Sequence, residues 1–190
     1  MRNLPLSLVA LALCSAPALA ADSAPQFKGM AMISMELSAR IAPREEPFEL
    51  DRFMPADGLD ELAGTWSNFG AEHRFSNGTP NPVNTVIIHA SLSGFAAAMG
   101  KSCREPLLQL NDRFADTLEE ICAWPKPKAK TDAAMSAFWL ALMGYEAPKQ
   151  EYLAWRDFFL SSSYRDRPAT ETVAAMTLAI TMNPYFLITK

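Results

Sequence analysis

Apolar residues recur every three or four positions along the second half of the chain, a spacing typical of amphipathic helices. Each of these stretches begins near a residue that favours a helix start and ends at a cysteine, a glycine or an Asn-Pro pair, or before a serine run. We therefore predict five helices: from Pro82 to about Met99, Arg113 to Cys122, Ala133 to Met143, Pro148 to about Leu160, and Glu171 to Met182.

Local signals set the expected ends of these helices. Asn81 followed by Pro82 is typical of a cap with proline in the first turn, where the missing amide has no partner to lose. The other expected signals are Gly100 and Gly144 as stops, Thr131 or Asp132 as the cap of the third helix, and Asn183-Pro184 as the end of the last. The β-branched run 86–88 would also suit a strand, but no second convincing strand exists to pair with it, so we favour helix.

The segment from residue 21 to residue 80 has weaker periodicity. We interpret Gln26 to Glu61 as mixed coil and short helix, Leu59 to Phe69 as one or two helical turns, and Ser76 to Pro80 as a turn. With the helical segment 81–190 it should form one domain, mostly α, a bundle of about five or six helices. The expected core contains Phe138, Trp139, Phe159, Met176 and Leu178, with the apolar run 185–188 docked against it.

Residues 1–20 have the pattern of a secretory signal peptide. Arg2 precedes an apolar run, and Ala18-Leu19-Ala20 is the small-x-small pattern of a cleavage site. We expect cleavage near Ala20 and export to the periplasm. No later stretch has the roughly 18 continuous apolar residues of a membrane helix, so we expect no transmembrane segment in the mature chain.

Export changes the interpretation of the cysteines, because disulfides persist in oxidising compartments. Removal of residues 1–20 leaves Cys103 and Cys122, and we favour a bridge between them over two buried free thiols. A continuous helix between them would hold the two Cα atoms about 28 Å apart, whereas a disulfide requires about 7 Å or less. The bridge therefore predicts a break at Asn111-Asp112, with Asp112 capping the helix and Pro106 to Leu110 running back along it.

Charge excludes one class of partner. Without Arg2, the chain has 16 Lys and Arg residues against 21 Asp and Glu residues, a net charge of −5. A protein that binds nucleic acid needs basic residues gathered on one face, and here they lie among acidic neighbours. We therefore expect no nucleic-acid partner.

Catalytic signatures are missing from the sequence, and the catalytic residues remain unknown. The two histidines, His73 and His89, lack the spacing of a zinc motif, and no glycine-rich phosphate loop or serine nucleophile motif is present. Carboxylate pairs such as Glu119-Glu120 occur in any acidic domain. One alternative is an enzyme whose site joins His73 or His89 to a carboxylate only in the folded chain.

A second alternative comes from Met30, Met32 and Met35. Thioethers are soft ligands that select Cu(I), so this cluster suggests a periplasmic copper-binding protein. Methionine is also a common core residue, and Met32 and Met35 would share one helix face. We expect no other cofactor.

Taken together, these patterns favour a non-enzymatic function. The leading hypothesis is an exported accessory or inhibitor/immunity-type protein that acts by binding another periplasmic protein. Four tryptophans and eleven phenylalanines supply material for an apolar interface, although most should lie in the core.

Overall fold

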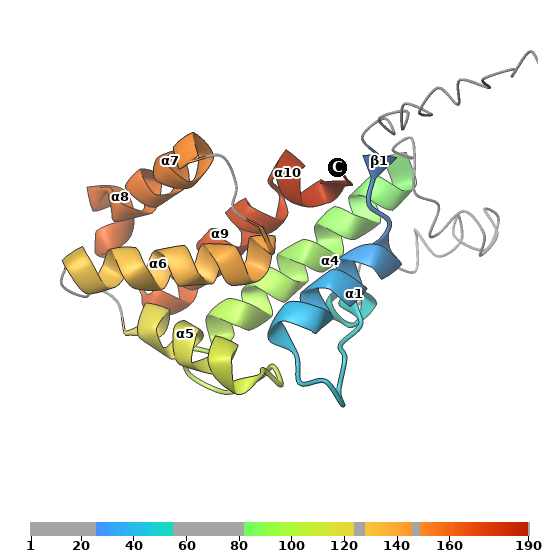
Figure 1. Ribbon diagram of the computed structural model, residues 1–190, viewed down its shortest axis with the longest axis horizontal. Helices are drawn as coiled ribbons and strands as arrows, with labels where there is room; N and C mark the ends of the chain where they lie inside the picture. Colours follow the sequence, from blue (N-terminus) through green and yellow to red (C-terminus); the bar gives the residue numbers. More distant parts are fainter. Residues whose placement is uncertain (1–25, 55–81, 124–127, 146–148, 190) are drawn as a thin grey trace, which may run out of the picture.

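The computed structural model describes residues 26–54, 82–123, 128–145 and 149–189, and these are mostly helical (Figure 1). Six helices in this part of the chain have eleven residues or more: α1 (Met30–Ile41), α4 (Pro82–Lys101), α5 (Asp112–Cys122), α6 (Lys128–Met143), α7 (Lys149–Leu160) and α9 (Ala169–Thr181). The shorter elements are β1 (Gln26–Phe27), η1 (Leu50–Phe53), α8 (Ser162–Arg165), α10 (Pro184–Leu187) and β2 (Ile188–Thr189). The predicted mostly helical fold is confirmed.

Helix α4 crosses the molecule and packs most extensively against α9 (Figure 1). Gly100 makes this close approach possible, since a Cβ atom there would lie 2.2 Å from the Thr170 carbonyl oxygen of α9. The sequence analysis placed Gly100 just after the helix as a stop signal, which is wrong: α4 continues to Lys101. The residue is glycine because α9 lies against it.

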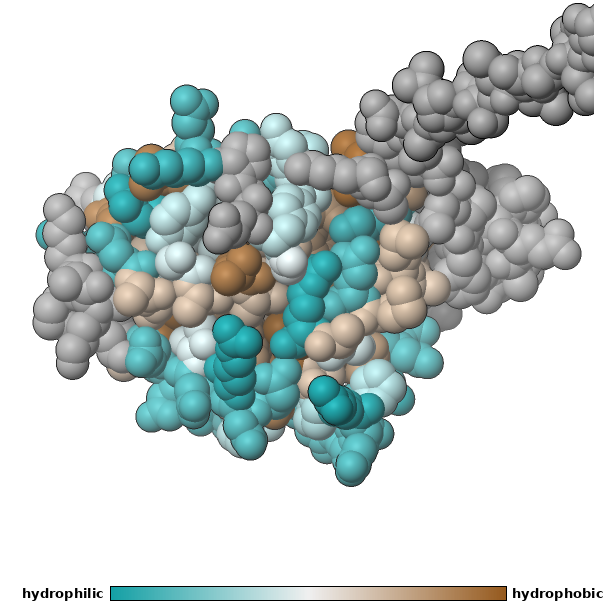
Figure 2. Space-filling view, in the orientation of Figure 1, coloured by the Kyte–Doolittle hydropathy of each residue, from teal (hydrophilic) through white to brown (hydrophobic). Residues whose placement is uncertain are grey.

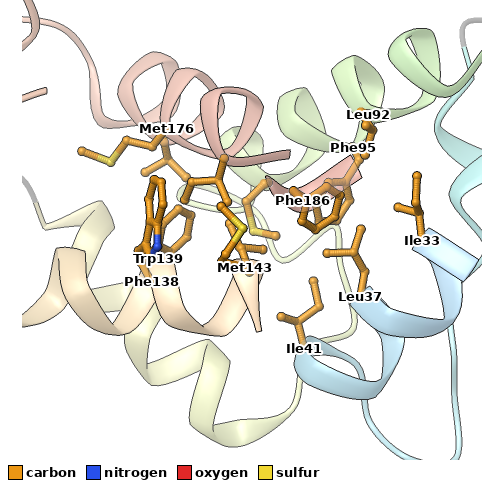
Figure 3. Packing of buried hydrophobic residues seen from close by; sticks show 14 of the residues in the cluster. Ile33, Leu37, Ile41, Leu92, Phe95, Phe138, Trp139, Met143, Met176 and Phe186 are labelled. Carbon is orange, nitrogen blue, oxygen red and sulfur yellow. The ribbon is translucent and has the colours of Figure 1, made fainter. Parts of the chain in front are cut away.

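Helix α1 is the most regular part of the N-terminal segment that the structure describes. Ile33, Leu37 and Ile41 repeat every four positions and are completely buried. They face residues from α4, α6 and α10 in one hydrophobic cluster (Figure 3). Mixed coil with short helix was predicted for this segment. The helix observed there, α1, is twelve residues long and packs into the core, so it is longer and more deeply buried than predicted.

The core of the C-terminal half agrees closely with the prediction. Phe138, Trp139, Phe159 and Met176 are at most 3% exposed, whereas Leu178 is only partly buried. Leu178 was therefore a wrong choice, and the next completely buried apolar residue of α9 after Met176 is Ile180. Met176 and Leu178 are two positions apart, about 200° around a helix, so they do not face the same side, whereas Met176 and Ile180 do.

Helix α6 begins at Lys128, three or four residues before the cap expected at Thr131 or Asp132. That expectation was wrong because nothing after Pro127 prevents a helix. No residue after this proline lacks the backbone N–H group that helical hydrogen bonds require, so α6 can begin directly after it. The end of α6 is as predicted. Gly144 follows Met143 with φ of 80°, a left-handed conformation that favours glycine.

The C-terminal tail docks as predicted. Asn183 caps α10 by accepting a hydrogen bond from the Tyr185 amide, and Phe186 is completely buried among α1 and α4 residues (Figure 3). Strand β2 then pairs antiparallel with β1, with Phe27 opposite Ile188. The tail thereby joins the beginning of the described chain to its end.

The bridge between Cys103 and Cys122 is present, with Cα atoms 5.3 Å apart. Residues 106–111 have no regular secondary structure, and α5 begins at Asp112, so the predicted break is confirmed. The predicted cap was one residue off. Asn111, not Asp112, is the cap, and its side-chain oxygen accepts a hydrogen bond from the Phe114 amide at 2.9 Å.

Asn111→Ala should lower the free energy of unfolding by about 1 to 2 kcal/mol, because it removes both a helix cap and a tertiary hydrogen bond. The Asn111 amide nitrogen donates to the Arg40 carbonyl at 2.9 Å. Urea denaturation measures the change. Asn111→Asp keeps the cap acceptor but not this donor, so it should recover part of the loss; no recovery would show that the cap contributes little.

Several predictions fall outside the described residues. They are the signal peptide 1–20, the helical turns from Leu59 to Phe69, the turn from Ser76 to Pro80, His73, the cap at Asn81 and the helix start at Pro148. They stay predictions.

Candidate functional site

A groove of about 640 Å³ opens beside the disulfide. Its walls come from the loop after α1, the irregular segment before α5, and α5 itself. Apolar side chains line much of it: Pro43, Pro106, Leu108, Leu110, Ala115 and Leu118, together with the bridge between Cys103 and Cys122. An open groove with apolar lining is the kind of surface at which proteins bind ligands or partners.

Asn111 brings the walls of the groove together. Its backbone N–H donates to the Ile41 carbonyl at 2.9 Å, and its side chain donates to the Arg40 carbonyl at the same distance. These bonds hold the start of α5 against the end of α1, so the segments that follow Ile41 and precede Asn111 lie side by side. The disulfide fixes the other end of α5 to the end of α4.

The polar groups of the groove are acidic or neutral. Glu45, Glu46 and Glu119 contribute carboxylates, and all three residues are exposed. None of the lining residues is lysine or arginine. Figure 2 shows hydrophilic residues of either charge gathered along the lower edge of the molecule, where α5 and the loop after α1 lie, so the acidic character of the groove comes from its lining residues. The groove therefore favours a ligand that is both apolar and positively charged.

Sequence reasoning did not find this groove. It noted Glu119 only as one member of an unspecific carboxylate pair, and it placed no site in the loop after α1. The lining residues come from three separate stretches of the chain, so no local spacing joins them. The one available signal was the predicted bridge, which implied that the segment 106–110 and α5 lie together.

The three methionines of the copper hypothesis do not share one side of α1. Met30 is buried, Met32 is half-buried and Met35 is 65% exposed. Residues on a helix advance by about 100° each, so Met30 and Met32 lie on nearly opposite sides, whereas Met32 and Met35 lie about 60° apart. Two thioethers, not three, can therefore face a common ion from this helix.

His89 is exposed on α4, and among the described residues no hydrogen bond or ion pair joins it to a carboxylate. His73 lies outside that part of the chain, so the proposed pairing of a histidine with a carboxylate stays a prediction. No three His, Cys, Asp or Glu side chains within the described ranges are grouped so that they could hold a metal ion.

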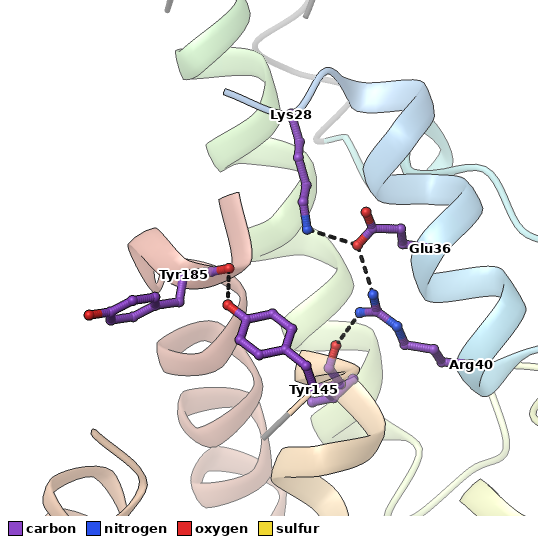
Figure 4. A network of polar contacts seen from close by, with 6 residues as sticks. Lys28, Glu36, Arg40, Tyr145 and Tyr185 are labelled. Carbon is purple, nitrogen blue, oxygen red and sulfur yellow. Dashed lines mark hydrogen bonds and ion pairs between the residues drawn. The ribbon is translucent and has the colours of Figure 1, made fainter. Parts of the chain in front are cut away.

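A polar network joins the residue before α1 to α1 and to the end of α6 (Figure 4). Glu36 of α1 accepts from Lys28 and from Arg40, each at 2.8 Å, and Arg40 also donates to the Leu142 carbonyl at 2.8 Å. Lys28 is only 6% exposed, so the ion pair with the Glu36 carboxylate is needed to compensate for burying its positive charge. Every group of the network is bonded to another element, which indicates a structural role.

Tyr145 lies beside this network and donates its hydroxyl proton to the Tyr185 carbonyl. Burial raises the pKa of the Tyr145 phenol above its ordinary value of 10.0, although nearby Arg40 opposes the shift. The folded protein thus favours the neutral phenol, and this stabilisation is complete below pH 10 and is lost as the pH rises through the raised pKa.

We therefore expect unfolding midpoints to fall more steeply above pH 10 in the parent protein than in Tyr145→Phe. Thermal unfolding at a series of alkaline pH values measures this. Tyr164→Phe serves as a control for replacing a tyrosine. Parallel curves for the parent and Tyr145→Phe would contradict the assignment.

An aromatic surface on α7 and α8 is a second candidate for contact with a partner. Phe158 is 55% exposed, and its ring centroid lies 5.2 Å from that of Tyr164. The Arg167 guanidinium lies over the Tyr164 ring, 5.1 Å from its centroid. Exposed apolar residues are common on protein surfaces, so this exposure alone does not define a site.

No family model, no curated protein and no solved structure matches this chain. Among the helices described, none combines the length and apolar character needed to cross a membrane.

Proposed function

We propose that this protein is an exported, non-enzymatic accessory or inhibitor/immunity-type protein that works by binding another protein in the periplasm. The observation that carries the proposal is the groove beside the Cys103–Cys122 bridge, because it combines an open apolar lining with an acidic rim. Its lining residues include no nucleophile activated by a base, which favours binding over catalysis.

Two further observations support an exported setting. The signal-like pattern of residues 1–20 predicts secretion, and a disulfide persists outside the reducing cytoplasm. The bridge also forms part of the groove. A binding surface that depends on a disulfide suits a protein that functions in the periplasm.

The proposal is tested by native mass spectrometry of the tagged protein, released gently from the periplasm of the bacterium that makes it. The expected spectrum contains the processed chain with a protein partner in fixed stoichiometry, and the complex should form again from the two purified components. The unfolded sample supplies the mass of the processed chain alone. A processed chain without a partner under these conditions would contradict the proposal.

Copper binding remains a second candidate on one observation, which is that Met32 and Met35 share a side of α1 and Met35 is largely exposed. The same native spectrum tests it. A bound copper ion that disappears in Met35→Leu and persists in Met30→Leu would support it, and a copper-free chain after incubation with Cu(I) would reject it.

A further inference from the structure

We propose that the groove beside the disulfide binds an extended peptide segment that carries both apolar and basic side chains. This inference rests on the proposed function and names the chemistry of the partner at its site. The segment would lie along the irregular stretch before α5, place leucine-like side chains against the apolar lining, and direct lysine or arginine toward the acidic rim.

The size and lining of the groove suit apolar side chains. At about 640 Å³ it falls within the range of sites that bind ligands, about 300 to 1,000 Å³. Leu108 and Leu110 are half-buried, and Leu118 is 4% exposed beneath them. An apolar side chain that covered these residues would be stabilised in proportion to the apolar surface removed from water.

Charge complementarity selects a basic partner. Glu45 and Glu46 stand on one wall and Glu119 on another, so carboxylates approach the groove from two directions. No lining residue offsets them with a positive charge. At the lining itself, lysine or arginine side chains would therefore be favoured over aspartate or glutamate.

The backbone beside the groove favours an extended peptide over a compact ligand. Among the described residues, no hydrogen bond partner is found for the backbone N–H and C=O groups of residues 107–110. These four residues are exposed or half-buried, so their polar groups can reach water. An extended peptide can replace that water with main-chain hydrogen bonds, as in strand addition, and alternate side chains then enter the groove.

A matched pair of variants isolates the groove. Glu119 lines it, while Glu120 is the next residue of α5, is also exposed and does not line it. Glu119→Lys and Glu120→Lys change the net charge equally and lie near the C-terminal end of α5, where a positive charge is tolerated. Leu108→Ser and Leu107→Ser form a second pair, since Leu107 is 51% exposed and outside the lining.

The probe is a short synthetic peptide in which leucine alternates with lysine, compared with the same peptide carrying glutamate in place of lysine. Isothermal titration calorimetry with the oxidised, processed protein measures binding. We expect the lysine peptide to bind and the glutamate peptide not to bind. Glu119→Lys and Leu108→Ser should each weaken the lysine peptide at least tenfold, while Glu120→Lys and Leu107→Ser should change its affinity less than twofold. Circular dichroism confirms that each variant is folded.

Three results would overturn the inference. The lysine peptide could fail to bind, both peptides could bind alike, or Glu119→Lys and Glu120→Lys could weaken binding equally, as for general attraction to an acidic protein. Self-association that Glu119→Lys abolishes and Glu120→Lys preserves would assign the groove to a second copy of the chain and would also overturn it.

Failure of this inference is distinguishable from failure of the proposed function. A natural partner that remains bound to Glu119→Lys and Leu108→Ser, but is lost in Phe158→Ala, would place the interface on α7 and α8. That result would overturn the groove assignment and leave the binding function in place. Absence of any natural partner would contradict the proposed function itself.

Discussion

Replacing both Cys103 and Cys122 with alanine is expected to lower the free energy of unfolding by about 3 kcal/mol. The bridge spans 19 positions of the sequence, and closing a loop of that size restricts the unfolded chain. The folded protein loses little direct packing, since both cysteines are only partly buried. Urea denaturation followed by circular dichroism measures the difference between the parent protein and the double variant.

Reduction of the parent protein provides the control for this prediction. A reducing agent should destabilise the parent by a similar amount and leave the double variant unchanged. A loss below about 1 kcal/mol would show that the hydrogen bonds of Asn111 hold α5 in place without the bridge. Loss of lysine-peptide binding in the reduced parent would further connect the bridge with the groove, because both cysteines line it.

Gly100→Ala is expected to destabilise the protein by about 3 kcal/mol, because α4 and α9 must move apart to admit a methyl group. The added Cβ atom would lie 2.2 Å from the Thr170 carbonyl oxygen and 2.9 Å from the Ala174 Cβ atom. The first of these is a backbone atom and cannot rotate away. Thermal or urea unfolding provides the measurement.

Ala97→Gly is the matched control for Gly100→Ala. Ala97 lies on the exposed side of the same helix, where alanine is favoured over glycine by about 1 kcal/mol. The two substitutions should therefore show opposite preferences: glycine is better at position 100 and alanine is better at position 97. A gain in stability on Gly100→Ala would contradict the close approach of α9.

Sequence patterns predicted the positions of the helices well wherever local chemistry decides them. Pro82 begins α4, Gly144 ends α6, and Asn183-Pro184 follows the end of α9, because proline, glycine and asparagine each act on the backbone within a few residues. The disulfide and its loop were also predictable. A helix rise of about 1.5 Å per residue cannot join Cys103 to Cys122, so the chain must turn between them.

Other features depended on contacts between distant segments. Gly100 has the local signature of a helix stop, yet it lies within α4 because α9 approaches it. Asp112 and Asn111 are comparable caps by propensity. Asn111 is the cap in the folded chain, where its side-chain amide also donates a hydrogen bond to the Arg40 carbonyl. The length and burial of α1 likewise follow from the surface that α4, α6 and α10 offer to it.

By itself, the sequence predicted the helical class and most helix ends, because these follow from backbone propensity and periodicity, and it favoured the bridge because the signal-like pattern predicts an oxidising compartment. Only the tertiary structure decided the groove, since its apolar lining and its three glutamates come from separate segments that the Asn111 bonds and the disulfide bring together. The folded structure also decided which of Met30, Met32 and Met35 are buried, although these residues are neighbours in sequence. Helix rotation buries one and exposes another, so closeness along the chain did not place them on one side.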